Sequence, residues 1–163
     1  MSINDFNVAM NLINKYKTHC ITNAGSSVSE IGNAEKQLGL LLPSSYKTFL
    51  KNFGYWTFEG SEIFGLYNNT IINFTKDERA NNENPKFPDC LVVIHALGNG
   101  ELSCLDTSQI NDDEECPVVA WYFGATLPNG KLEVLAEDFG AFLLEKVQWG
   151  LESLKEDGGK VNK

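Results

Sequence analysis

The chain has 163 residues, of which 13 are basic and 22 are acidic, so its formal net charge at pH 7 is -9. Hydrophobic residues make up 42% and aromatic residues 11% of the chain, which excludes an intrinsically disordered protein. Binding to nucleic acid or to an anionic membrane relies on Lys and Arg, so the acidity argues against both and favours basic partners. A chain of this length fits one domain with its own core.

The N-terminal part of the chain predicts two helices. Ser2 caps the first, whose apolar residues recur every three or four positions up to an end near His19. Residues 23–27 read as a loop, and Ser29 is the expected N-cap of the second helix. Gly39 ends that helix because glycine accepts a positive φ without a Cβ clash. The two apolar faces consist of Phe6, Met10, Ile13, Ile31, Ala34 and Leu38.

A third helix is expected over residues 43–53, because its leading proline suits a first helical turn and the apolar residues after it share one face. Gly54 ends this helix, and Tyr55 and Trp56 form an aromatic turn beyond it. Residues 61–64 lie between two glycines and read as a short strand. The apolar face of the helix consists of Tyr46, Phe49, Leu50 and Phe53.

The middle of the chain predicts one helix and one hairpin. Residues 68–70 fit either a hairpin turn or a helix cap, and the apolar period after them favours a helix over 70–80. Residues 81–89 contain two prolines and three asparagines and read as a surface loop. Residues 91–94 and 102–106 are expected to pair as a hairpin that turns at the glycine-rich segment between them.

The C-terminal part predicts two more strands and a closing helix. Residues 118–123 are the most β-prone run, with Trp121 packing inward and Tyr122 facing outward. Asn129-Gly130 is a strong turn dipeptide that leads into a strand over 131–135. The final amphipathic helix carries on its apolar face Phe139, Phe142, Leu143 and Val147.

This order of elements, with helices mainly first, then an antiparallel or mixed twisted sheet and one closing helix, predicts an α+β fold. We expect a single domain over residues 1–155 and a frayed C-terminal tail over 156–163. The first residues lack the basic and then apolar pattern of a secretory signal, and no segment approaches the ~20 apolar residues of a membrane span. A cytoplasmic location with reduced cysteines is therefore expected.

The sequence indicates no metal site, no cofactor site and no catalytic residue. The four cysteines stand far apart, without the Cys-x-x-Cys or histidine spacing of a zinc site. The glycines around Asn99 lack the Lys-Ser/Thr pair and the helix start of a phosphate loop. A pair of His95 and Cys104 across the hairpin is the last enzymatic alternative, and we interpret both as core residues.

Two groups of residues are candidates for binding a partner. The first is the acidic run of Asp112, Asp113, Glu114 and Glu115, which lies in a loop between two expected strands. These carboxylates either face a basic partner surface or keep the loop solvated, and the pattern leaves both interpretations open.

The second group surrounds the expected aromatic turn, where Tyr55 and Trp56 are accompanied by Glu59 and Glu62. Tyrosine and tryptophan are common anchors of protein interfaces. The alternative is that they pack in the core, as we expect for Phe58. Both alternatives stay open for Tyr55 and Trp56.

An ordered set of short motifs extends over nearly the whole chain. The N-terminal motifs are Ala34-Glu35, Leu38-Gly39, Leu42-Pro43, Phe49-Leu50 and Glu62-Ile63-Phe64-Gly65-Leu66. The C-terminal motifs are Leu97-Gly-Asn-Gly, Leu105-Asp106, Pro117-Val-Val-Ala-Trp and Leu135-Ala-Glu-Asp-Phe. Taken together, they resemble the SUKH superfamily, which holds bacterial immunity proteins and a yeast regulator of cell-wall glucan synthesis.

The resemblance implies a SUKH-type fold and a binding protein that is not an enzyme. In bacteria such a protein is usually an immunity protein, or antitoxin, that stays in the cytoplasm and neutralises a cognate secreted toxin, often a nuclease. The partner is then the toxin, with a basic surface if it is a nuclease, and the two groups above are the candidate toxin-binding residues. The alternative is an intracellular scaffold or regulatory protein without a toxin partner.

Overall fold

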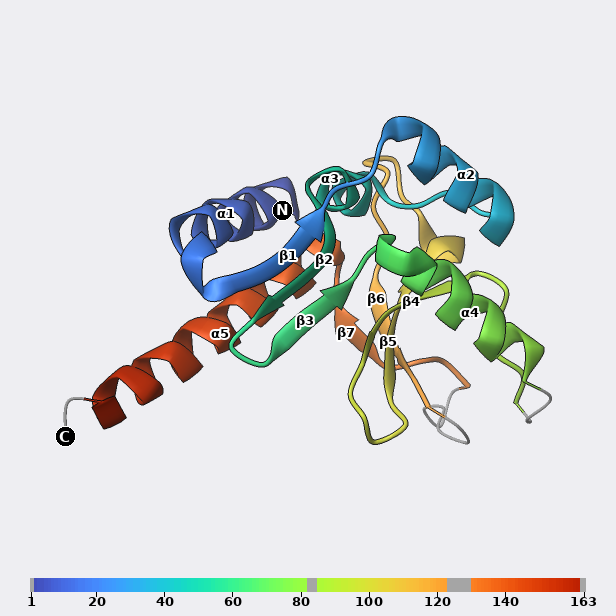
Figure 1. Cartoon of the computed structure of the whole chain (residues 1–163). Helices are drawn as coiled ribbons and strands as arrows, with labels where there is room; N and C mark the ends of the chain where they lie inside the picture. Colours follow the sequence, from blue (N-terminus) through green and yellow to red (C-terminus); the bar gives the residue numbers. More distant parts are fainter. Residues whose placement is uncertain (1, 82–84, 123–129, 162–163) are drawn as a thin grey trace.

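A computed structural model describes residues 2–81, 85–122 and 130–161 of the chain (Figure 1). Its α-helices are α1 (Ser2–Lys15), α2 (Val28–Leu38), α3 (Ser44–Asn52), α4 (Thr70–Ala80) and α5 (Phe139–Val161). Its strands are β1 (Cys20–Ala24), β2 (Phe53–Phe58), β3 (Ser61–Phe64), β4 (Leu91–Ala96), β5 (Leu102–Asp106), β6 (Val118–Trp121) and β7 (Val134–Ala136). Short 3-10 helices are η1 (Lys17–His19), η2 (Tyr67–Asn69) and η3 (Thr107–Gln109).

The strands form two antiparallel sheets. The first sheet has the order β1-β2-β3 and the second has the order β4-β5-β6-β7. Neighbouring strands in each sheet follow one another along the chain or are joined through the helices between them. The α+β class is confirmed, with the expected N-terminal helices and closing C-terminal helix around two sheets.

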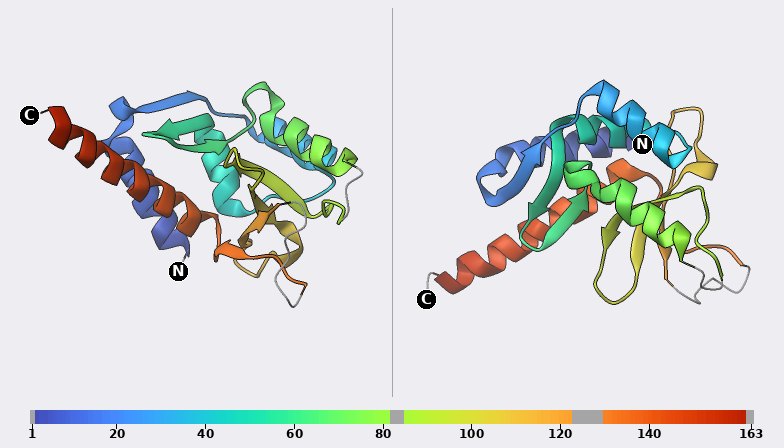
Figure 2. Two further views of the ribbon diagram at one scale, coloured as in Figure 1. Left: turned by 90° about the horizontal axis from the view of Figure 1, so that it is seen from below. Right: turned by 45° about the vertical axis from the view of Figure 1, so that its right-hand side comes forward.

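The helices cover the sheets from several sides (Figures 1 and 2). α1 lies along α5, and α5 also contacts α3, β3 and β7. α4 packs on β4, where the backbone N–H of Val93 donates to Oγ1 of Thr75 at 3.0 Å. The C-terminal end of α5 extends away from the rest of the chain (Figure 1).

The core is built from the helix faces that the sequence predicts. The buried residues of α2 are Ile31, Ala34 and Leu38, and those of α5 include the four apolar positions named above. At the centre, the Phe139 ring lies edge-on to the rings of Tyr46 and Phe49, with centroid distances of 5.0 and 5.3 Å. The buried hydroxyl of Tyr46 donates to the carbonyl of Phe64 at 2.7 Å, which connects α3 to β3.

The ends of α2 differ slightly from the prediction. Ser27 is the N-cap instead of Ser29, and its Oγ accepts the N–H of Glu30 at 3.1 Å. A side chain caps a helix by accepting the N–H three residues ahead, and Ser27 holds the extended backbone that this requires. Gly39 takes the left-handed conformation at φ 70, as predicted.

The strand β1 was not predicted, and the expected aromatic turn is wrong. Tyr55 and Trp56 lie in β2, which begins at Phe53, directly after α3. Gly54 does not end a helix; a Cβ there would lie 2.7 Å from the carbonyl oxygen of Ala24, so glycine lets β1 pair closely with β2. β1 escaped prediction because it carries no buried side chain, and its Ile21 is 71% exposed.

Two differences concern the C-terminal part. α5 continues as a helix to Val161, beyond residue 155, where we expected a frayed tail to follow. The last strand covers Val134–Ala136 instead of 131–135. The predicted turn residue Asn129 and the end of the predicted strand over 118–123 lie outside the described residues.

Glycine substitutions test the close approach of the Gly65 backbone, directly after β3, to the Gly54 backbone in β2. Replacing Gly65 by alanine is expected to destabilise the chain by about 1–3 kcal/mol, because the new Cβ would lie 2.4 Å from the carbonyl oxygen of Gly54. Gly32→Ala is the matched control; it lies inside α2 with nothing within 4 Å of its Cβ position, and should stabilise by about 0.5–1 kcal/mol. Urea denaturation measures both, and equal effects of the two substitutions would contradict the role of close packing at Gly65.

Candidate functional surface

The acidic loop, which we define as residues 111–115, separates its four carboxylates into two kinds. Asp112, Asp113 and Glu114 are exposed, whereas Glu115 is only 3% exposed. Of the four candidate contact residues, Asp112, Asp113 and Glu114 are thus accessible to a partner, whereas the burial of Glu115 removes it from the candidates.

Glu115 caps helix α3 from a distant part of the chain. Its Oε1 accepts the backbone N–H of Ser45 at 2.9 Å and its Oε2 accepts the Ser45 hydroxyl at 2.7 Å. The N–H of Ser44 donates to the carbonyl of Glu114 at 2.8 Å. The first N–H groups of a helix need acceptors from outside, and the N-cap Pro43 provides no side-chain acceptor. A carboxylate at this end also interacts favourably with the helix dipole.

The rest of the acidic loop is held by its own hydrogen bonds. Oδ1 of Asn111 accepts the backbone N–H groups of Asp113 and Glu115 at 2.9 and 3.0 Å. The N–H of Asn111 donates to the carbonyl of Glu115 at 2.8 Å, which closes the loop, and Glu114 adopts a positive φ of 60 within it. The three exposed carboxylates are therefore presented on a backbone that is ordered without a partner.

In the second candidate group, Tyr55 and Glu62 lie in contact, whereas Trp56 is buried and is no longer a candidate for binding a partner. Alternation along β2 buries Trp56 completely, so it belongs to the core and is not a surface contact. Tyr55, on the other face, is half-buried and donates its hydroxyl to Oε2 of Glu62 at 2.5 Å. Burial, together with this carboxylate, raises the pKa of Tyr55 to about 12. Glu59 is partly exposed at the turn between β2 and β3.

His95 lies beside Glu62 without forming a catalytic pair. Nδ1 of His95 is 3.8 Å from Oε1 of Glu62, which is longer than a hydrogen bond. His95 pairs in register with Ser103, whereas Cys104 is opposite Val93 and fully buried. Burial raises the pKa of the Cys104 thiol well above its usual range, so the thiolate needed for nucleophilic chemistry is disfavoured.

The buried histidine predicts a pH dependence of stability. Burial is the main cause that lowers the pKa of His95 below 6.5, and Lys146 adds to it, while Glu62 acts in the opposite direction. The folded chain thus binds this proton less readily than the unfolded chain, so the stability is complete above pH 6.5 and falls as the pH decreases through the folded pKa. We expect urea midpoints of His95→Gln to fall less than those of the wild type between pH 7 and 5. The exposed His19, changed to Gln, is the control and should follow the wild type.

Across residues 2–81, 85–122 and 130–161, no three His, Cys, Asp or Glu side chains gather as a metal site would require. The helices of the same ranges are too short or too polar to cross a membrane.

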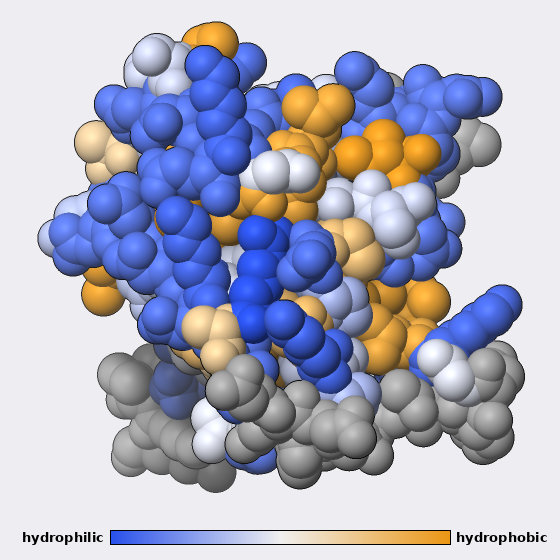
Figure 3. Space-filling view, turned by 90° about the vertical axis from the view of Figure 1, so that its right-hand side faces the viewer, coloured by the Kyte–Doolittle hydropathy of each residue, from blue (hydrophilic) through white to orange (hydrophobic). Residues whose placement is uncertain are grey.

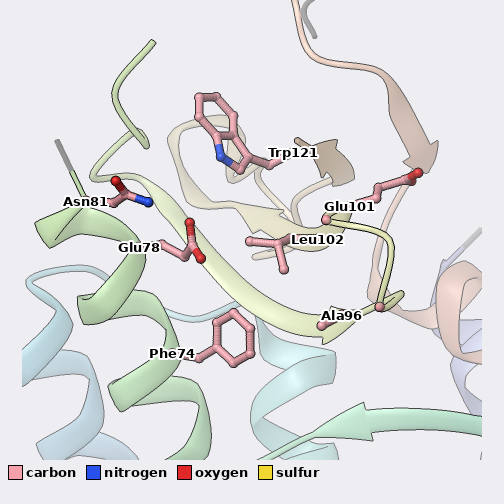
Figure 4. A pocket seen from close by; sticks show the side chains of 9 residues that line it. Phe74, Glu78, Asn81, Ala96, Glu101, Leu102 and Trp121 are labelled. Atoms are coloured by element: carbon pink, nitrogen blue, oxygen red, sulfur yellow. The ribbon is translucent and has the colours of Figure 1, made fainter. Parts of the chain in front are cut away.

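A pocket that the sequence analysis missed lies between α4 and the second sheet (Figure 4). This α4 pocket has a volume of about 390 Å³. Phe74 and Glu78 extend into it from α4, and Leu102 and Trp121 come from β5 and β6 (Figure 4). Glu101 also belongs to its lining, but its side chain points away from Phe74 and Glu78 (Figure 4). Its residues come from segments far apart in the sequence, so no local pattern signals it.

The surrounding surface is largely polar. Seen from the side that carries α2 and α4, the molecule is mostly hydrophilic, with hydrophobic areas separated by polar ones (Figure 3). The α4 pocket thus combines apolar walls with one carboxylate, that of Glu78, in a polar environment. Such an arrangement suits a side chain with an apolar stem and a positive charge.

Comparison with models of known protein families gives a match for this chain. The family model SUKH_6, described as SMI1-KNR4 cell-wall, matches residues 29–143. This range begins in α2 and ends in α5, so it includes most of both sheets, the acidic loop and the α4 pocket. Because the match covers more than half of the chain, the chain belongs to the SUKH superfamily, as its sequence motifs predict.

Proposed function

We propose that the chain is an intracellular immunity protein that binds a cognate secreted toxin stoichiometrically and neutralises it without catalysis. Membership of the SUKH superfamily supports this, because its members generally bind other proteins and do not catalyse reactions.

The observation that best supports the proposal is the set of three exposed carboxylates, on an ordered loop, of Asp112, Asp113 and Glu114. A nuclease binds phosphate through Lys and Arg, so its active site offers a basic surface. An acidic loop that is ordered before binding loses little conformational entropy when it docks on such a surface. The formal net charge of -9 adds long-range attraction to a basic partner.

The α4 pocket provides a second contact for the same kind of partner. An Arg or Lys side chain of the toxin would place its stem against Phe74 and Trp121 and its charge near Glu78. Tyr55, Glu59 and Glu62 remain further candidates, since each is at least partly accessible. Trp56 and Glu115 act through the fold, because both are buried.

Co-expression tests this function directly. The test requires a toxin domain encoded next to this gene, which is produced in bacteria with and without the chain while growth and co-purification are measured. We expect restored growth and a complex of defined stoichiometry. If the chain restores neither, the immunity proposal fails, and the alternative of a regulatory scaffold is favoured.

A further inference from the structure

The second sheet has a pocket on each of its faces. Consecutive residues of a strand point to opposite sides, and in β5 Leu102 lines the α4 pocket while Ser103 lines a second pocket, against α5. We call the latter the α5 pocket. It encloses about 160 Å³, which is the liquid volume of about five water molecules.

The α5 pocket contains a lysine that is almost fully buried. Lys146 is only 6% exposed, and its Nζ lies 4.1 Å from the ring centroid of Trp149 and 5.1 Å from that of Phe142. Within the part of the chain that the structure describes, no carboxylate oxygen comes within 4.0 Å of this ammonium. Glu101 and Glu145 line the same pocket at a greater distance.

The pocket also contains a hydroxyl without a partner. Ser103 is 1% exposed, and its Oγ has no hydrogen-bond partner among the described residues. Buried polar groups in folded proteins are nearly always hydrogen-bonded, so each exception requires an explanation. Ser103 Oγ is such an exception, and it lines one cavity with the Lys146 ammonium, whose nearest printed contacts are two aromatic rings. Both groups are hydrogen-bond donors.

We propose that the α5 pocket binds a single carboxylate group carried on a short apolar stem. The ammonium of Lys146 and the hydroxyl of Ser103 donate to the carboxylate oxygens, and Leu97, Leu135 and Trp149 pack against the stem. This site is independent of the toxin proposal, because it lies on the opposite face of the sheet from the α4 pocket.

Charge and size together select a carboxylate. Glu101 and Glu145 repel any anion in the pocket, but they repel a phosphate with two negative charges more strongly than a carboxylate with one, which pairs with the single cation Lys146. The volume of about 160 Å³ is below the roughly 300–1,000 Å³ of pockets for drug-sized ligands. The pocket therefore accepts one acidic side chain of a protein or one small organic acid.

Nuclear magnetic resonance of the full chain, labelled with nitrogen-15, tests the site with propionate as the probe. We expect a saturable shift of the Trp149 indole signal, assigned with Trp149→Phe, and a dissociation constant in the millimolar range, since the probe has few atoms. Propionamide, the neutral isostere, and inorganic phosphate at matched ionic strength should bind at least about tenfold more weakly. Phosphate binding equal to that of propionate would overturn the assignment to a carboxylate.

Substitutions in α5 and β5 localise the site. Lys146→Met keeps the length of the stem without the charge and should weaken propionate binding by at least about tenfold. The matched control is Lys155→Met, which removes the same charge from an exposed position of the same helix and should bind as the wild type does. Ser103→Ala removes only the unpaired hydroxyl and should weaken binding about threefold or more. Unchanged binding by a folded Lys146→Met or Ser103→Ala chain would refute the proposal.

A second ligand distinguishes the two sources of a carboxylate. N-acetyl-glutamate N-methylamide presents the same carboxylate on a peptide backbone. Tighter binding of this compound than of propionate supports a protein side chain as the ligand, and tighter binding of propionate supports a small acid. If neither propionate nor N-acetyl-glutamate N-methylamide gives a saturable shift that depends on Lys146, the proposal that the α5 pocket binds a carboxylate is refuted.

Discussion

Replacing Glu115 by alanine is expected to destabilise the folded chain by about 2–3 kcal/mol. The carboxylate accepts both the backbone N–H and the hydroxyl of Ser45, and both contacts are buried. Its removal leaves these two donors of the first turn of α3 without acceptors inside the protein. Hydrogen bonds to a charged group are stronger than neutral ones, and the cost of unpaired buried donors adds to their loss.

Urea denaturation measures this effect, with two comparisons. Glu115→Gln keeps an acceptor oxygen for Ser45 and should lose less stability than Glu115→Ala. Asp113→Asn changes an exposed carboxylate of the same loop and should stay within about 0.5 kcal/mol of the wild type. A loss for Glu115→Ala as small as that for Asp113→Asn would show that the capping contact does not stabilise α3.

Neutralising the exposed part of the acidic loop is expected to slow toxin association while leaving the fold intact. The triple substitution Asp112→Asn, Asp113→Asn and Glu114→Gln should lower the association rate at low salt by about tenfold or more. Charges at the edge of an interface act mainly on the rate of encounter, whereas the dissociation rate depends on the packed contacts. This prediction depends on the proposed immunity function.

Stopped-flow binding to the purified toxin domain at several salt concentrations measures the effect. The control neutralises three exposed carboxylates at the other end of the molecule, Glu152, Glu156 and Asp157 of α5, and changes the net charge by the same amount. We expect the control to retain most of the rate and of its salt dependence. Equal slowing of the two variants would mean that net charge alone, and not the acidic loop, guides association.

The helices were largely predictable because their signals are local. The apolar faces of α2, α3 and α5 repeat every three to four residues, and the buried positions match them except at Phe53, which begins β2 and is only partly buried. α4 was also predicted with its observed bounds, residues 70–80, although its first cap was ambiguous between a turn and a helix. The hairpin of β4 and β5 followed from two apolar segments around a glycine-rich turn.

The elements that were missed depend on partners distant in the sequence. β1 has no buried side chain and is a strand only because its backbone pairs with β2. Gly54 resembled a helix stop, yet its role is to let the carbonyl of Ala24 approach closely. Trp56 was ambiguous between core and surface until the pairing of β2 decided which face it takes.

The sequence by itself determined the α+β class, the main helix faces and the family, because periodicity and ordered motifs lie along the chain. Only the tertiary structure decided which carboxylates are available for binding. The acidic run is uniform in sequence, but Glu115 meets Ser45, which lies 70 residues before it, and becomes a helix cap. Both pockets likewise exist only where distant segments meet across the second sheet, since burial and hydrogen bonding depend on neighbours that no local pattern specifies.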